Sequence, residues 1–114
     1  MRLSEIRDAL RCQVLAGEDG LTQEVDTVVA SDGMSEILAF ARPGALMVTG
    51  LTNVQSVRTA DIANVRAIVY IRGKRPAEPA VSLARKRNIP VLATELGMFD
   101  VCWMLRERGL TGGM

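Results

Sequence analysis

Residues suited to binding a small anion lie in two short turns of this chain, each following an apolar run. The turns contain small, polar and basic residues: Gly50, Thr52, Asn53, Arg72, Gly73 and Lys74. Glycine lets a ligand approach the backbone, hydroxyl and amide groups form hydrogen bonds, and basic side chains supply positive charge. The helix expected after Asn53 directs free amide groups to the same place. We therefore predict a site for an anion such as the phosphate of an adenine nucleotide, without a metal ion or cofactor.

The same residues also have an ordinary structural interpretation. Thr-Asn before a helix is common capping chemistry. Basic residues on an exposed turn are usually just solvated. Neither the Walker A spacing nor the G-x-G-x-x-G spacing is present, so established phosphate-binding loops give no support. The sequence leaves both interpretations of the turns open.

The chain lacks the residue types that most reactions need. It contains no histidine, the commonest general base and metal ligand. Cys12 and Cys102 lie near opposite ends, without a Cys-x-x-Cys pair, so two buried, reduced thiols are expected rather than a zinc site, and a disulfide would require the chain ends to meet. Asp32 and Glu95 could meet at one rim and hold magnesium for phosphoryl transfer, although helix capping is their more ordinary role. We predict that the chain is not an enzyme.

Composition excludes several classes of partner. Fourteen basic and thirteen acidic residues leave a net charge of +1, too small to favour nucleic acid or an anionic membrane surface. No apolar run approaches the roughly 20 residues of a membrane span. The first residues form a polar amphipathic segment and not a signal peptide. A cytoplasmic protein with reduced thiols is expected.

Apolar periodicity predicts alternating strands and helices. Helices are expected over residues 3–11, 54–65, 78–87 and 98–108, with another beginning at the N-cap Ser35. Strands are expected over residues 12–15, 24–30, 45–48, 67–71 and 89–93. Because a helix joining two neighbouring parallel strands makes a right-handed βαβ unit, the turns after successive strands should meet at one rim.

The predicted fold is therefore α/β, with a mostly parallel sheet and helices on both faces. Residues 1–110 should form a single domain, and residues 111–114 a flexible tail. The opening helix and strand should pack on an edge of the sheet, with strand order there left open. Phe99 and Trp103 occur at helical spacing, as expected of a core face or a subunit interface, and a homodimer is expected.

Three segments carry a family resemblance: VTGLTNVQSVRTADIANV at 48–65, AIVYIRGKRP at 67–76, and NIPVLAT at 88–94. Together with LSEIRDAL and VVASDGMSEIL, they make the chain resemble the DRTGG domain family over nearly its whole length. Two family motifs differ here. Leu51-Thr52-Asn53 replaces the usual Gly-Asp-Arg, and Ile71-Arg72-Gly73 replaces the usual Thr-Gly-Gly.

The resemblance implies a small α/β domain, commonly dimeric, that occurs alone or attached to nucleotide-sensing modules and enzymes such as phosphotransacetylase. It is also similar to the non-catalytic amino-terminal domain of HPr kinase/phosphorylase. We therefore expect a homodimeric regulatory or ligand-binding domain. The GLTN form resembles members found near genes for iron-only hydrogenase. The alternative is therefore an interaction subunit of an anaerobic redox complex that binds no small ligand.

Overall fold

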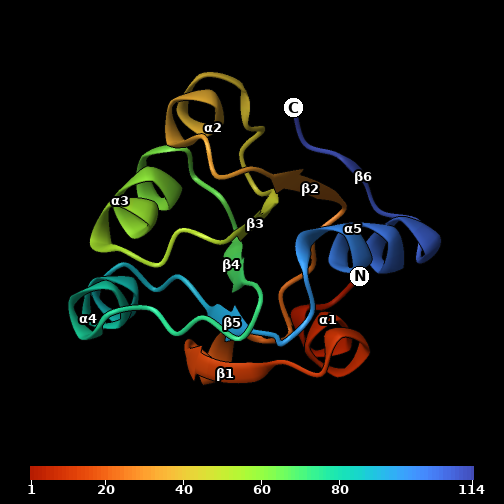
Figure 1. Cartoon of the computed structure of the whole chain (residues 1–114), viewed down its shortest axis with the longest axis horizontal. Helices are drawn as coiled ribbons and strands as arrows, with labels where there is room; N and C mark the ends of the chain where they lie inside the picture. Colours follow the sequence, from red (N-terminus) through yellow and green to blue (C-terminus); the bar gives the residue numbers. More distant parts are fainter.

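The computed structural model describes all 114 residues and has a six-stranded sheet at its centre (Figure 1). The strands are β1 (Gln13–Ala16), β2 (Thr27–Ala30), β3 (Leu46–Thr49), β4 (Ala67–Tyr70), β5 (Val91–Ala93) and β6 (Thr111–Gly112). Their order is β1-β5-β4-β3-β2-β6. Only β1 runs antiparallel to its neighbour, so the predicted mostly parallel α/β fold is confirmed.

Helices cover both faces of this sheet (Figure 1). One face packs against α2 (Met34–Phe40), α3 (Val54–Ile62) and α4 (Glu78–Lys86). The other face packs against α1 (Leu3–Leu10) and α5 (Met98–Glu107), and a short 3₁₀ turn, η1 (Glu18–Gly20), follows β1. None of the helices is long and apolar enough to span a membrane.

The central strands are buried on both sides because their side chains alternate between two apolar cores. Met47 of β3 and Tyr70 of β4 point toward the layer of α2, α3 and α4. Val48 and Val69, the alternate residues of the same strands, point toward α1 and α5. Every residue of β3 and β4 is buried, which explains why both strands are continuous apolar runs in the sequence.

A buried polar contact fixes the start of α3 against the sheet. The Ser56 hydroxyl donates to the Asn53 carbonyl at 2.6 Å and lies 2.7 Å from the Tyr70 hydroxyl. Because the Ser56 proton is used toward Asn53, the Tyr70 hydroxyl donates to Ser56. Tyr70 is fully buried, so this bond satisfies a polar group that would otherwise destabilise the core. The turn before α3 is thereby held rigidly over β4.

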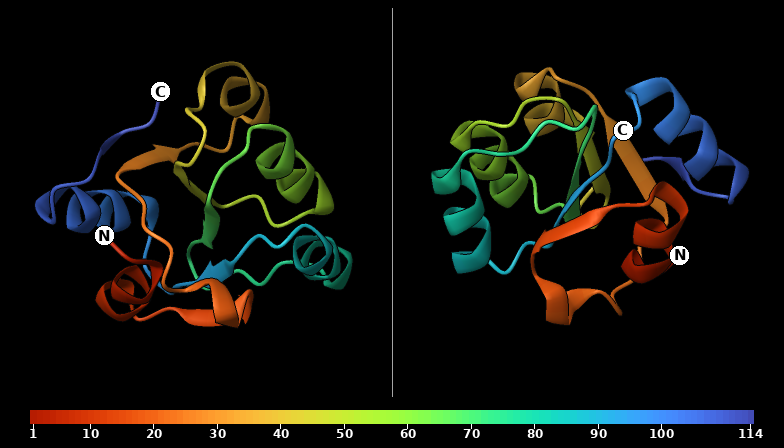
Figure 2. Two further views of the ribbon diagram at one scale, coloured as in Figure 1. Left: turned by 180° about the vertical axis from the view of Figure 1, so that it is seen from behind. Right: turned by 60° about the horizontal axis from the view of Figure 1, so that its bottom comes forward.

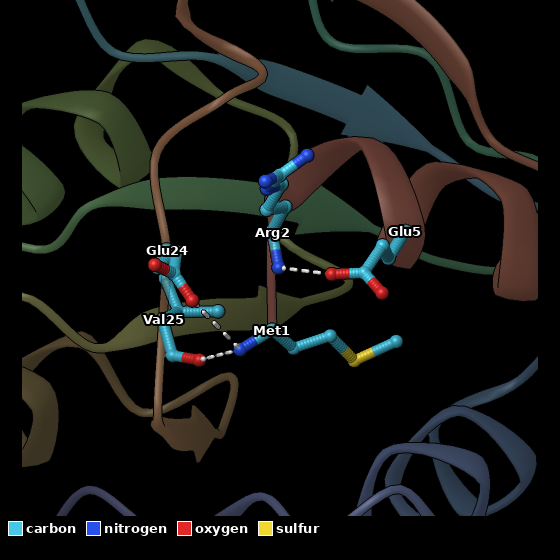
Figure 3. A network of polar contacts seen from close by, with 5 residues as sticks. All are labelled: Met1, Arg2, Glu5, Glu24 and Val25. Carbon is cyan, nitrogen blue, oxygen red and sulfur yellow. Dashed lines mark hydrogen bonds and ion pairs between the residues drawn. The ribbon is translucent and has the colours of Figure 1, made fainter.

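The amino-terminal segment is held at the edge of the molecule by polar contacts (Figure 3). The Met1 amino group donates to the Val25 carbonyl at 3.0 Å and lies 3.9 Å from the Glu24 carboxylate. The Arg2 N–H donates to Glu5 Oε1 at 2.8 Å, where α1 begins. After α1, β1 adds to β5, so the opening segment lies at the sheet edge as expected.

The carboxyl-terminal residues differ from the expectation of a loose tail over 111–114. Thr111 and Gly112 form β6, which pairs in parallel with β2. Gly113 donates to the Val28 carbonyl and accepts from the Arg42 N–H, both at 2.7 Å. A Cβ on Gly113 would come within 3.1 Å of the Ala45 Cβ, so glycine permits this close approach. The prediction of a flexible tail is therefore wrong.

Several element boundaries also differ from the predicted ones, and three of them lie near the site or the sheet edge. β2 begins at Thr27 and not at residue 24. The N-cap of α2 is Gly33 and not Ser35. α3 ends at Ile62 because Asn64 adopts a left-handed conformation (φ 61°), and Val65 then donates back to the Ala60 carbonyl. Such boundaries depend on local hydrogen bonds that periodicity does not report.

Candidate functional site

The turns that follow four parallel strands meet at one rim of the sheet. Hydrogen bonds connect each turn to a neighbour. The Gly50 N–H donates to Asp32 Oδ1 at 2.7 Å, the Arg72 N–H to the Leu96 carbonyl at 2.8 Å, and the Gly73 N–H to the Thr94 carbonyl at 2.9 Å. This meeting of loops is what a parallel sheet predicts at the carboxyl ends of its strands. The two predicted turns, at Gly50 and at Gly73, therefore lie on the same rim.

Gly50 is covered by the side chain of Arg72. A Cβ at position 50 would stand 2.6 Å from Arg72 Nη2, closer than real side chains approach. Glycine therefore allows the guanidinium group to lie across the backbone of the neighbouring turn. The Gly50 N–H is already used by Asp32, so this donor has an internal carboxylate as its partner.

Thr52 and Asn53 have structural partners within the chain. Asn53 is the N-cap of α3, and its Oδ1 accepts from the Ser56 N–H at 3.1 Å. The Thr52 carbonyl accepts from the Ala77 N–H at 3.2 Å, which attaches the end of the 72–77 segment to this turn. The capping interpretation thus describes Asn53 correctly.

Arg72, Gly73 and Lys74 form an exposed turn between β4 and α4. Arg72 (φ 59°) and Gly73 (φ 67°) are both left-handed, an uncommon conformation for arginine that is held here by two backbone hydrogen bonds. A side chain at position 73 would collide with the Glu95 carboxylate. Arg72 and Lys74 are therefore exposed residues on either side of a glycine, and the Arg72 side chain lies over the Gly50 turn.

Asp32 is a carboxylate of this rim that accepts two hydrogen bonds from the Gly50 turn. Besides Gly50, it accepts from the Thr49 hydroxyl at 3.0 Å. The pKa of Asp32 is lowered below its ordinary value of 3.8, mainly by the Gly50 hydrogen bond. Partial burial raises this pKa, whereas the Thr49 hydrogen bond and the charges of Arg72 and Lys74 lower it further. Asp32 therefore stays charged at neutral pH and attracts the basic turn.

This lowered pKa predicts a pH-dependent contribution to stability. A depressed folded-state pKa stabilises the protein above the unfolded pKa and is lost as the pH falls through the folded value. Asp32→Asn should therefore lower the free energy of unfolding at pH 6 by up to about 1 kcal/mol, because the group is largely exposed. The gap to the unmodified chain should be smaller at about pH 3, because protonation of Asp32 removes the charge that the asparagine variant lacks. Urea unfolding at both pH values measures it, with the exposed Asp26→Asn as control. A gap independent of pH would contradict the argument.

A cavity of about 300 Å³ opens beside Gly73, on the side away from Gly50. Its lining is almost entirely polar: Arg11, Gln13, Gly73, Arg75, Ala93, Thr94 and Glu95. Arg75 donates to Gln13 Oε1 at 2.9 Å and so connects the basic turn to β1. Arg11 and Gln13 were absent from the predicted site because they precede the parallel strands and reach the rim only through the antiparallel β1. No local motif signals their participation.

The cations of this rim are not neutralised by ion pairs. Arg11, Arg72, Lys74 and Arg75 have no carboxylate oxygen within 4.0 Å, and the ion pairs of the chain all lie elsewhere. An unpaired cluster of positive charge attracts small anions.

The two carboxylates of the rim engage different turns, Asp32 at Gly50 and Glu95 at Gly73. Neither caps a helix, because the N-caps of α2 and α5 are Gly33 and Gly97 and have no side-chain bond. No group of three or more His, Cys, Asp or Glu side chains that could hold a metal ion is present. The two acids of the magnesium alternative contact different turns.

Both cysteines are free and partly buried. Burial raises the pKa of Cys12 to about 12 and also raises the pKa of Cys102. Both thiols are therefore protonated at neutral pH, which makes them poor nucleophiles. Phe99 and Trp103, in contrast, are 84% and 59% exposed, so they do not belong to the core.

Comparison with known proteins bears on the family and the fold. A sequence model of the DRTGG domain matches residues 5–108. Curated proteins yield no match. The fold is similar to a crystal structure of the CBS and DRTGG domains in the regulatory region of Clostridium perfringens pyrophosphatase, complexed with its activator, diadenosine tetraphosphate. The TM-score is 0.74 at 20% identity. The alignment covers 91% of this chain but only 45% of the other, so the chain spans less than half of that structure.

The family match covers most of the sequence, and the fold is similar to a structure whose description includes a DRTGG domain. The chain therefore belongs to the DRTGG domain family.

Proposed function

We propose that this chain is a non-catalytic regulatory domain that binds a phosphate-containing small molecule at the rim described above. The observation that carries the proposal is a set of four cations without ion pairs at this rim: Arg11 and Arg75 line the Gly73 cavity, and Arg72 and Lys74 flank Gly73 in the same turn. Phosphate oxygens bind arginine in a charge-assisted, often bidentate manner. A cavity of about 300 Å³ has room for more than an inorganic ion, so part of an organic ligand can enter it.

The roles within the predicted site divide into two groups. Arg11, Gly73 and Arg75 line the cavity, and Arg72 and Lys74 add positive charge from the turn beside it. Gly50, Thr52 and Asn53 shape the neighbouring turn, because they are hydrogen-bonded to Asp32, Ala77 and Ser56 respectively. An adenine nucleotide is the favoured ligand class. The similar pyrophosphatase region was crystallised with diadenosine tetraphosphate, which supports this choice without establishing it for this chain.

Calorimetric titration with ATP, ADP, diadenosine tetraphosphate and inorganic phosphate tests this function. We expect saturable binding of at least one adenine nucleotide. Arg72→Gln/Lys74→Gln should weaken it by about tenfold or more, since each charged hydrogen bond contributes roughly 1.5–3 kcal/mol. The control Arg58→Gln/Lys86→Gln removes the same charge from exposed helix positions and should change affinity less than about twofold. No heat and no shift in melting temperature with any probe would reject the proposal.

We further propose that the domain is a homodimer formed through α5. Phe99 and Trp103 are four residues apart and therefore share one exposed face of this helix. Exposed aromatic pairs are costly in water and typical of interface centres. A second copy presents the same face, so a two-fold contact pairs these side chains with each other.

Sedimentation velocity measures this oligomeric state. The unmodified chain should sediment as a dimer, Phe99→Ser/Trp103→Ser as a folded monomer, and the control Ile62→Ser, at a side chain 72% exposed on α3, as a dimer. A monomeric unmodified chain would contradict the proposal. The exposed face of α5 would then fit the alternative function, docking to a subunit of an anaerobic redox complex. Recovery of that complex together with the chain from the native host would support this alternative.

A further inference from the structure

We propose a second ligand site at the opposite rim of the sheet, which binds a small polyhydroxylated anion such as a sugar phosphate or sugar acid. A cavity of about 420 Å³ lies there, where β3, β4 and β5 begin. Figure 2 shows the helix-to-strand turns of this rim in two further views of the ribbon, one of them from behind. Nothing in the proposed nucleotide site contributes to this cavity, so the two proposals are independent.

The three helix-to-strand turns each contain a left-handed residue that shapes the cavity wall. Gly44 (φ 86°), Asn64 (φ 61°) and Asn88 (φ 57°) hold these positions. The backbone N–H groups of Asn64 and Asn88 close the ends of α3 and α4, but their side-chain amides form no hydrogen bond within the chain. Each free amide offers a donor and an acceptor, which is the pairing that a hydroxyl group needs.

The cavity continues into a neighbouring one of about 270 Å³, which shares Gln23, Asn88 and Ile89 with it. The combined groove is long enough for a ligand larger than a single inorganic ion. Only three of the eleven residues lining the larger cavity are hydrophobic and none is aromatic, so the site does not provide a stacking platform for a base. These walls suit a polar, non-aromatic ligand.

Arg66 supplies an available positive charge. Its guanidinium has no carboxylate within 4.0 Å and makes only a weak 3.5 Å contact with Gln23 Oε1. Arg87, on the other wall, is bound to Asp61 at 3.5 Å by a single contact, and its side chain is 57% exposed, so it can turn toward a ligand. Two guanidinium groups against one carboxylate leave the larger cavity net positive.

Helix ends explain why an anion alone does not match this site. The carboxyl ends of α3 and α4 reach this rim and carry partial negative charge, which attracts hydrogen-bond donors and repels anions. Arg66 attracts an anionic group, whereas the helix ends and the free amides attract hydroxyl groups. A molecule that carries both, an anionic group on a polyol, satisfies both halves of the cavity.

Calorimetric or amide-shift titration of the full chain with ribose 5-phosphate and gluconate tests the site, with ribose and inorganic phosphate as partial ligands. We expect saturable binding of ribose 5-phosphate or gluconate, and binding at least about tenfold weaker for either partial ligand. Amide shifts should map to residues 64–66 and 87–89.

Substitutions separate this site from the nucleotide site. Arg66→Gln should weaken binding about tenfold, whereas Arg58→Gln, an exposed arginine on α3 outside the cavity, should change it less than about twofold. Arg72→Gln should leave the binding of gluconate, which carries no phosphate, unchanged. No saturable binding of either probe, equal effects of Arg66→Gln and Arg58→Gln, or a loss of gluconate binding caused by Arg72→Gln would overturn the inference. None of these results depends on whether the chain binds nucleotides.

Discussion

Gly17→Ala should destabilise the protein by about 3 kcal/mol and lower its melting temperature by roughly 10 °C. Gly17 is left-handed (φ 76°), a conformation that costs alanine about 1–2 kcal/mol. A Cβ there would also stand 2.6 Å from the Pro90 Cα, a backbone atom. Pro90 cannot withdraw easily, because its carbonyl accepts the Ile68 N–H at 3.0 Å. The turn after β1 and the start of β5 must therefore separate.

Urea unfolding and a thermal melt measure this effect. Gly112→Ala is the matched control, since its φ is not left-handed and a Cβ there meets nothing within 4 Å. The control should change the free energy of unfolding by less than about 0.5 kcal/mol. Comparable stability of the two variants would show that β1 and β5 do not approach as closely as described.

Truncation after Leu110 should have the next largest effect, a loss of about 3 kcal/mol. It removes three backbone hydrogen bonds, at roughly 1 kcal/mol each. They join Thr111 to the Asp26 carbonyl, Gly113 to the Val28 carbonyl, and Arg42 to the Gly113 carbonyl. It also leaves β2 as an unprotected edge strand, so the truncated chain should aggregate more readily.

Chemical denaturation of the truncated chain and hydrogen exchange of the Gly113 amide in the full chain test this expectation. Removal of Met114 alone is the control and should be nearly neutral, because Met114 is exposed and no hydrogen bond of this residue is recorded. Unchanged stability after truncation, together with rapid exchange at Gly113, would restore the interpretation of 111–114 as a loose tail.

Strong local patterns identified the elements that build the rim. The apolar runs before Gly50 and Arg72 were predicted as buried strands, and they became β3 and β4 within one residue at either end. Helical spacing likewise placed α3, α4 and α5 at their observed starts. Such patterns report burial and periodicity, which depend on neighbours a few residues away. When strands and helices alternate and the strands run parallel, the turns after the strands must lie at the same rim of the sheet.

Local patterns did not report which polar groups of the site are already occupied. Gly50 was expected to let a ligand approach the backbone, but its N–H is already bound by Asp32, eighteen residues earlier. The Gly73 cavity gains Gln13 through its bond to Arg75, a pair separated by sixty-two residues. Contacts at such distances depend on strand order, and a single sequence leaves strand order open.

The sequence by itself determined the family, the mostly parallel α/β architecture and the basic and glycine-containing turns, because these follow from residue type and short-range periodicity. Tertiary structure alone decided the position of β1 and β6 at opposite edges, the exposure of Phe99 and Trp103, and the cavities at the two rims. These features arise where segments distant in the chain pack together. Their energies depend on neighbours that residue order does not specify.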